Sequence, residues 1–113
     1  MRLPGVDQAV IEPSKLRDYL LSRSHPIGRF KAAFFAVLGY TEATWQRLES
    51  DLRNLARSQD AGAGQESKYG LKYEIRGTLK GPFGRSAEVV TVWIVATGEE
   101  VPHFVTAFPG EKL

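Results

Sequence analysis

Apolar residues recur every three or four positions through the first half of the chain, which is the spacing of one face of an α-helix. Pro26 suits a first helical turn, Gly39 favours a helix end, and Thr41 is a candidate N-cap. Three helices are therefore predicted, over residues 14–21, from His25 or Pro26 to Gly39, and from Thr41 to about residue 57.

The second and third predicted helices each carry an apolar stripe. The stripe of the second helix is predicted to be buried, whereas the third helix has charged residues on its other face and is expected to be half solvated. The second stripe consists of Ile27, Phe30, Phe34, Val37 and Leu38, and the third of Trp45, Leu48, Leu52 and Leu55.

From Leu71 onward the apolar residues alternate with polar ones, which is the period of a β-strand. Strands are predicted over residues 71–80, 85–96 and 101–108, joined by turns at 81–84 and 97–100. Residues 58–68 are small and polar without periodicity, so they are predicted to form a mobile loop.

The alternation also predicts two faces for this sheet. Pairing that is symmetric about a four-residue turn places Glu74 opposite Thr91, Arg76 opposite Val89 and Thr78 opposite Ala87. The face toward the helices is then Tyr73, Ile75, Leu79, Val90, Val92 and Ile94, and the polar face is Lys72, Glu74, Arg76, Thr78, Thr91 and Trp93. One core is expected from Phe30, Phe34, Leu38, Trp45, Leu48, Leu52, Val90, Val92 and Ile94.

The predicted fold class is α+β, with N-terminal helices packed on a C-terminal three- to four-stranded antiparallel β-meander. A chain of 113 residues is the size of one domain and too small for two cores. We predict a single domain over residues 1–113, with a helical part at about 10–57, the loop at 58–68 and a sheet part at 69–109. No apolar run resembles a signal peptide or a membrane span, so a cytoplasmic location without membrane contact is expected.

Composition narrows the chemistry. The chain has no cysteine, which excludes disulfides and catalytic thiols. Its two histidines and scattered carboxylates lack the spacing of a zinc site, so we expect no metal and no cofactor. His103, between Pro102 and Phe104, is expected at an edge or surface position. The net charge of +2 permits a polyanionic partner without requiring one.

A candidate phosphate site lies at the start of the second predicted helix. His25, Arg29 and Lys31 fall within its first turns, where free N–H groups attract anions. The alternative is that His25 caps the helix and the two cations are ordinary surface charges. Gly28 has no helical benefit, which suggests close approach of a backbone or a ligand. The polar sheet face likewise has an alternative interpretation, a solvated surface with an amphipathic Trp93.

A set of residues spread from the first predicted helix to the second predicted strand carries a family resemblance: Lys15, Leu16, Tyr19, Leu20, Leu21, His25, Pro26, Gly28, Lys31, Ala32, Phe35, Leu38, Gly39, Tyr40, Tyr69, Gly70, Tyr73, Gly81, Pro82, Gly84, Thr91, Trp93 and Ile94. On these residues the chain closely resembles an uncharacterised family of small bacterial domains, and the similarity spans nearly its whole length. That family in turn resembles the barnase, EndoU, colicin and RelE group of metal-independent ribonucleases, which includes C-terminal modules of contact-dependent toxins.

The resemblance implies a site over the sheet. It implies attack of a ribose 2′-hydroxyl on the adjacent phosphate, giving a 2′,3′-cyclic phosphate without a metal. Histidine suits proton transfer near neutrality, a cation would hold the phosphate, and tryptophan stacks on bases. The chain lacks an obvious glutamate and histidine pair like that of barnase. The implied catalytic residues are His25, Lys31, Thr91 and Trp93, with Arg29, Arg76 and Lys72 binding RNA and Glu74 as a reserve general base.

A second function class remains open at this point. The chain is alternatively a non-catalytic protein-binding module, such as an antitoxin or one half of a two-gene pair, that uses the polar sheet face. Under the ribonuclease hypothesis the partners are RNA, tRNA among the candidates, and a small cognate immunity or antitoxin protein. Both hypotheses therefore predict a protein partner, and catalysis separates them.

Overall fold

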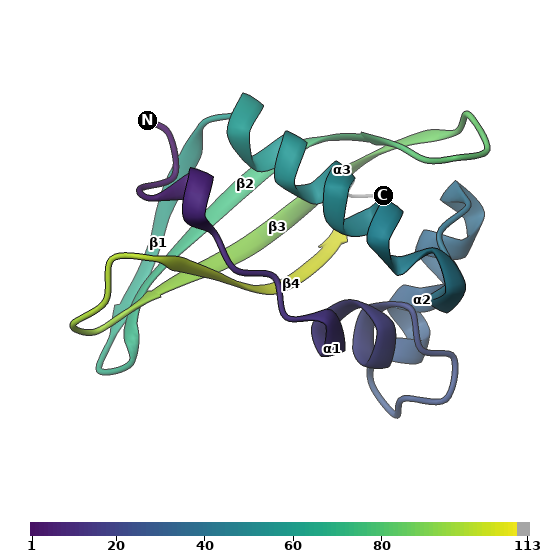
Figure 1. The fold of residues 1–113 in the computed structure, drawn as a ribbon, viewed down its shortest axis with the longest axis horizontal. Helices are drawn as coiled ribbons and strands as arrows, with labels where there is room; N and C mark the ends of the chain where they lie inside the picture. The colour runs from purple at the N-terminus through teal and green to yellow at the C-terminus, as the bar shows by residue number, and fades with distance from the viewer. Residues whose placement is uncertain (111–113) are drawn as a thin grey trace.

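Helices precede an antiparallel sheet in the computed structural model, which describes residues 1–110 (Figure 1). The predicted α+β class and its element order are confirmed. The helical elements are η1 (Val6–Gln8), α1 (Pro13–Lys15), η2 (Leu16–Leu20), α2 (Gly28–Leu38), η3 (Glu42–Thr44) and α3 (Trp45–Ser58). The strands are β1 (Ala61–Ser67), β2 (Gly70–Lys80), β3 (Ser86–Ala96) and β4 (Pro102–Pro109), which pair in the order β1-β2-β3-β4.

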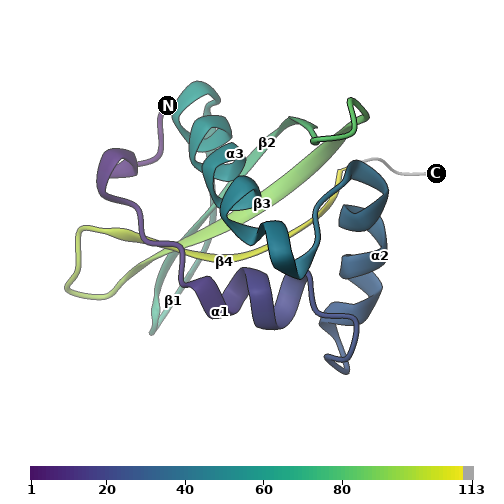
Figure 2. The same ribbon diagram turned by 45° about the vertical axis from the view of Figure 1, so that its right-hand side comes forward.

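Helix α3 lies across one face of the sheet, and α1 with η2 lies beside β4, as Figures 1 and 2 show. Leu48, Leu52 and Leu55 on α3 are buried in one core with Ile75 and Leu79 of β2. The opposite face of β2 carries polar side chains that are exposed to solvent, Lys72, Glu74 and Arg76 among them. The core therefore lies between α3 and one face of the sheet, and the other face is available to a ligand.

The predicted register between β2 and β3 is wrong by one residue. Glu74 pairs with Val92, Arg76 with Val90 and Thr78 with Glu88. The cause is the turn, which has one residue more than predicted because Arg85 belongs to it. The Gly81 N–H donates to the Arg85 carbonyl at 2.9 Å. A one-residue slip moves every side chain of a strand to the other face.

The slip moves Thr91 and Trp93 into the core, where neither has any solvent exposure. Val92 and Ile94, expected in the core, lie half-buried on the opposite face. The Trp93 Nε1–H donates to Thr91 Oγ1 at 2.9 Å, and the Thr91 hydroxyl donates to the Ile75 carbonyl at 3.0 Å. This pair is a satisfied polar link inside the core and not part of an exposed polar face.

This placement predicts a structural effect of Thr91→Val. The substitution keeps the shape of the side chain but leaves the buried Trp93 N–H without an acceptor. We expect the free energy of unfolding to fall by about 1–3 kcal/mol, the usual cost of an unsatisfied buried polar group. Urea denaturation measures it, with Thr91→Ser as the control that keeps the hydroxyl. Equal stability of Thr91→Val and the parent chain would contradict the buried placement.

The segment predicted as a mobile loop contains a strand. Residues 61–67 form β1, which pairs with β2 from Ala61 opposite Ile75 to Ser67 opposite Gly70. Backbone pairing along a sheet edge needs no alternating apolar side chains, so the sequence carries no period-two signal there. The sheet consequently has four strands.

The face that α2 buries also differs from the prediction. Ala32, Phe35 and Leu38 are buried, whereas Phe30 is 70% exposed and Val37 is 55% exposed. The helix is apolar almost all round, so its sequence does not define the inward face. Gly28 lies on the buried face and lets α2 approach the Tyr19 backbone closely, and the buried Ala32 follows it by one helical turn.

Candidate functional site

The Lys31 ammonium joins three elements of the fold. It extends from α2 and donates to Tyr19 Oη of η2 and to Thr106 Oγ1 of β4, both at 2.9 Å. The same ammonium lies 5.2 Å from the centre of the Tyr19 ring, within the range of a cation–π contact. All three side chains are half-buried. A cation therefore holds two hydroxyls in fixed positions at the edge of the sheet.

Gly28 brings α2 close enough to η2 for this contact. A Cβ at position 28 would lie 1.9 Å from the Tyr19 carbonyl oxygen, so no side chain fits there. The close approach suspected from the sequence is to a backbone, that of Tyr19. Lys31 is one helical turn further along α2, which places its side chain over the Tyr19 ring.

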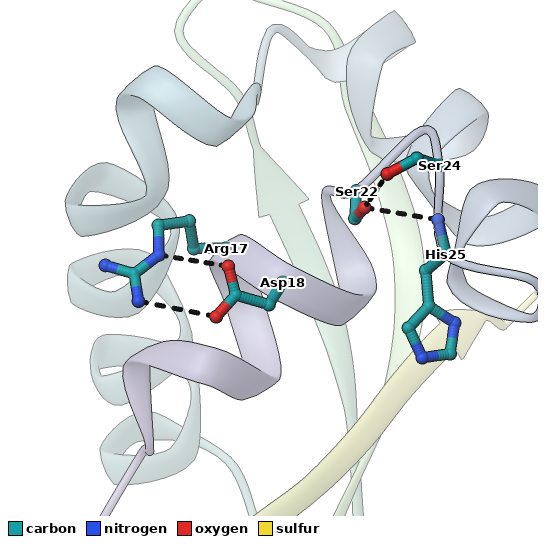
Figure 3. A network of polar contacts seen from close by, with 5 residues as sticks. All are labelled: Arg17, Asp18, Ser22, Ser24 and His25. Carbon is teal, nitrogen blue, oxygen red and sulfur yellow. Dashed lines mark hydrogen bonds and ion pairs between the residues drawn. The ribbon is translucent and has the colours of Figure 1, made fainter.

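His25 caps α2 and lines the same site. Its Nδ1 accepts from the N–H groups of Ile27 at 3.0 Å and Gly28 at 2.9 Å. Its own backbone N–H donates to Ser22 Oγ at 3.2 Å, and Ser22 in turn contacts Ser24, as drawn in Figure 3 beside the Arg17 and Asp18 pair. Because Nδ1 is an acceptor, Nε2 carries the ring proton of the neutral imidazole.

This geometry limits what His25 does. A base would need a free lone pair at Nε2, yet that nitrogen holds the proton while Nδ1 caps the helix. His25 is therefore suited to donate a hydrogen bond through Nε2–H. Its ring meets that of Tyr19 edge to face, with centroids 5.0 Å apart, so the two side chains position each other.

The surroundings of Tyr19 favour the ionised form of its phenol. The hydrogen bond from Lys31 is the largest cause that lowers the pKa of the Tyr19 phenol, and it outweighs the opposing effect of burial. A lowered pKa makes this phenol a stronger proton donor than a free tyrosine.

A β-bulge directs Thr106 to the site. Val92 pairs with Thr106 and Trp93 with Phe104, so Val105 is an extra residue in β4. Without it, Thr106 would lie on the same face as the buried Phe104. Bulges commonly redirect side chains in this way next to functional sites.

Two hollows meet at this bulge. The first has a volume of about 490 Å³ and is lined by Ser14, Lys15, Asp18, Tyr19, His25, Val105 and Thr106. The second has a volume of about 370 Å³ and is lined by Gly64, Gln65, Lys72, Glu74, Val92, Val105 and Thr106. They share Val105 and Thr106, so the edge strand β4 separates them. A ligand across β4 would contact both hollows.

The structure brings together some of the predicted site residues and separates others. His25 and Lys31 lie in the site, and Lys72 and Glu74 line the second hollow. The basic residues Arg29 and Arg76 lie elsewhere: Arg29 is exposed over the Phe30 ring, and Arg76 is paired with Glu88 and the Gly110 carbonyl. Thr91 and Trp93, expected on the polar face, are in the core.

Sequence reasoning misses two residues of the site, Tyr19 and Thr106. The spacing of Tyr19 matches that of the core residues around it, so the pattern assigns it to an apolar stripe. Thr106 follows the buried Phe104 by two positions, and only the bulge places it on the other face. Gly28 is the available signal for Tyr19, since a glycine in a helix start indicates a close neighbour.

The described residues hold no cluster of three or more histidine, aspartate or glutamate side chains that would bind a metal ion. His103 is half-buried on the edge strand β4, with its Nε2 3.7 Å from a Glu99 carboxylate oxygen. Within residues 1–110, no helix is long and apolar enough to span a membrane.

Comparisons with known proteins place the fold in context. The family described as "Domain of unknown function (DUF6883)" matches residues 2–111. No curated protein matches the sequence. Among solved structures, the chain is similar to one from a contact-dependent growth inhibition toxin and immunity protein complex of Klebsiella pneumoniae 342, with a TM-score of 0.68 and 16% identity, over 96% of this chain and 98% of that one. At this identity the likeness shows a shared fold.

Proposed function

The chain belongs to the DUF6883 family, and we propose that it is a metal-independent ribonuclease of the toxin type, with its site at Tyr19, His25, Lys31 and Thr106. The fold it shares with a chain of a toxin and immunity protein complex supports a role in such a system. The observation that carries the proposal is the Lys31 ammonium between two hydroxyls.

This cluster is built from hydrogen-bond donors. Each hydroxyl that accepts from Lys31 keeps its own hydrogen. The Thr106 hydroxyl also helps to lower the pKa of the Tyr19 phenol by hydrogen bonding, so the two hydroxyls are neighbours. Lysine has three N–H groups, of which two are used here. The two hydroxyls, the third N–H of Lys31 and His25 Nε2–H are thus available to an anion. Such an arrangement stabilises the charge that develops on a phosphorane.

The proposed reaction replaces one oxygen substituent of the phosphorus by another. The ribose 2′-oxygen forms a bond to the phosphorus while its proton passes to solvent water, and the bond from phosphorus to the 5′-oxygen breaks. Lys31 and Thr106 hold the non-bridging oxygens, and the Tyr19 phenol gives its proton to the departing 5′-oxygen. The products are a 2′,3′-cyclic phosphate and a 5′-hydroxyl, which are the products that the resemblance to metal-independent ribonucleases implies.

Tyr19→Phe tests this assignment. The variant keeps the ring that contacts His25 and removes the hydroxyl, so we expect RNA cleavage to slow by roughly 10²-fold, the scale of a general acid. Because an acid must be protonated, the parent rate should fall as pH rises through the Tyr19 pKa. Lys31 lowers that pKa below the value of about 10 for a free tyrosine.

Rate against pH for the parent and for Tyr19→Phe gives the measurement, and Tyr69→Phe at an exposed position is the control. An unchanged rate in Tyr19→Phe, with the same alkaline decline, would remove Tyr19 from the mechanism.

The outward face of α2 favours a protein partner, which both candidate functions require, the ribonuclease toxin and the non-catalytic binding module. Ile27, Phe30 and Val37 are exposed there, at 63%, 70% and 55%. Residues 22–41 contain cations and no carboxylate, so charge complementarity favours a partner with acidic side chains around an apolar centre. We propose a small cognate immunity or antitoxin protein for this face. A binding module would leave RNA intact.

A further inference from the structure

The second hollow contains a carboxylate that the proposed mechanism does not use. Glu74 is exposed on β2, and within residues 1–110 its carboxylate has no hydrogen bond and no ion pair. The half-buried Val92 lies opposite it and provides an apolar surface. Lys72 and Gln65 complete the polar groups of the hollow.

The position of this hollow relates it to the cleavage site. Both hollows reach Thr106, so a phosphate held by Lys31 and Thr106 would have one neighbouring nucleoside on each side of β4. One nucleoside would then lie toward Tyr19 and His25, and the other over Val92 beside Glu74. Val92 offers the flat face of a base an apolar contact.

We propose that this hollow recognises guanine through Glu74, an inference that rests on the proposed ribonuclease function. A carboxylate accepts two parallel hydrogen bonds. Among the four RNA bases, guanine has two adjacent donors on its pairing edge, N1–H and the N2 amino group. In adenine and cytosine the amino group adjoins a ring acceptor, which a carboxylate repels. Uracil has one donor between two carbonyls.

Glu74→Gln gives a sharp test because an amide has one acceptor and one donor group. That pattern matches the amino group and ring acceptor of adenine and equally the carbonyl and N1–H of guanine, so the amide does not discriminate between the two bases. The probes are dinucleotides with 2′-O-methyl groups, which cannot be cleaved: GpU, UpG, ApU and UpA. Titrations followed by ¹H–¹⁵N NMR give each Kd and show whether the amides of Val92 and Thr106 shift.

We expect the parent chain to bind GpU or UpG at least about 10-fold more tightly than the matching adenine dinucleotide, and Glu74→Gln to lose this guanine preference. Glu42→Gln, at an exposed position of η3, is the matched control and should retain the guanine preference. The inference would be overturned if the parent chain bound the guanine and adenine dinucleotides equally. It would also be overturned if Glu74→Gln kept the guanine preference of the parent.

Failure of the guanine subsite can be distinguished from failure of the ribonuclease proposal. RNA cleavage without any base preference would overturn the guanine subsite alone. A guanine preference in a protein that leaves RNA intact would support the subsite and overturn the ribonuclease proposal.

Discussion

Lys31→Ala should reduce RNA cleavage by about 10²–10³-fold, the usual effect of removing one preorganised group that stabilises transition-state charge. The substitution removes the cation itself. It also releases Tyr19 and Thr106 from the hydrogen bonds that orient their hydroxyls. Initial rates on a defined RNA measure this effect, with the melting temperature measured in parallel to show that the variant is folded.

Arg29→Ala is the matched control for this experiment. It removes one positive charge from the same helix, two residues away, at an exposed site over the Phe30 ring. We expect it to change the rate little at a fixed salt concentration. If both variants slowed cleavage equally, Lys31 would be acting through general attraction of RNA and not through the site.

Gly28→Ala should lower the free energy of unfolding by about 3 kcal/mol, the upper end of the usual cost of overpacking against a rigid neighbour. The added Cβ would lie 1.9 Å from the Tyr19 carbonyl oxygen and 2.7 Å from its carbon, so α2 must move away from η2. Alanine ordinarily stabilises a helix relative to glycine by about 1 kcal/mol, and the expected sign is therefore reversed.

Urea or thermal denaturation measures the Gly28 effect. Gly62→Ala is the control, because the nearest atom to a Cβ at position 62 is the Glu74 carbonyl oxygen, 3.9 Å away. A Gly28→Ala variant as stable as the parent would contradict the close packing that positions Tyr19 under Lys31.

The sequence predicts the elements of this fold better than their faces. Period and turn residues locate the helices and three of the strands, because those signals are local. The register of β2 and β3 depends on one residue, Arg85, which belongs to the turn, and this turn packs against another element at Gly81. A Cβ at Gly81 would lie 1.9 Å from the Leu38 carbonyl oxygen of α2. Local patterns do not contain such contacts.

The candidate site, like the fold, is predictable from the sequence only where local signals determine it. Lys31 and His25 can be proposed from the sequence because basic and titratable residues at a helix start indicate anion binding, although helix capping by His25 is the alternative to catalysis there. Thr106 depends on a bulge in β4, and the expected exposure of Thr91 follows from the incorrect register. A strand-face assignment from alternation alone is reversed by one bulge or one turn residue.

End-group analysis of RNA treated with the purified protein in excess EDTA tests the central claim most directly. If Tyr19, Lys31 and Thr106 cleave RNA without a metal, the fragments should carry 2′,3′-cyclic phosphates and 5′-hydroxyls, and EDTA should not reduce their yield. RNA that stays intact, or cleavage that EDTA abolishes, would contradict the account.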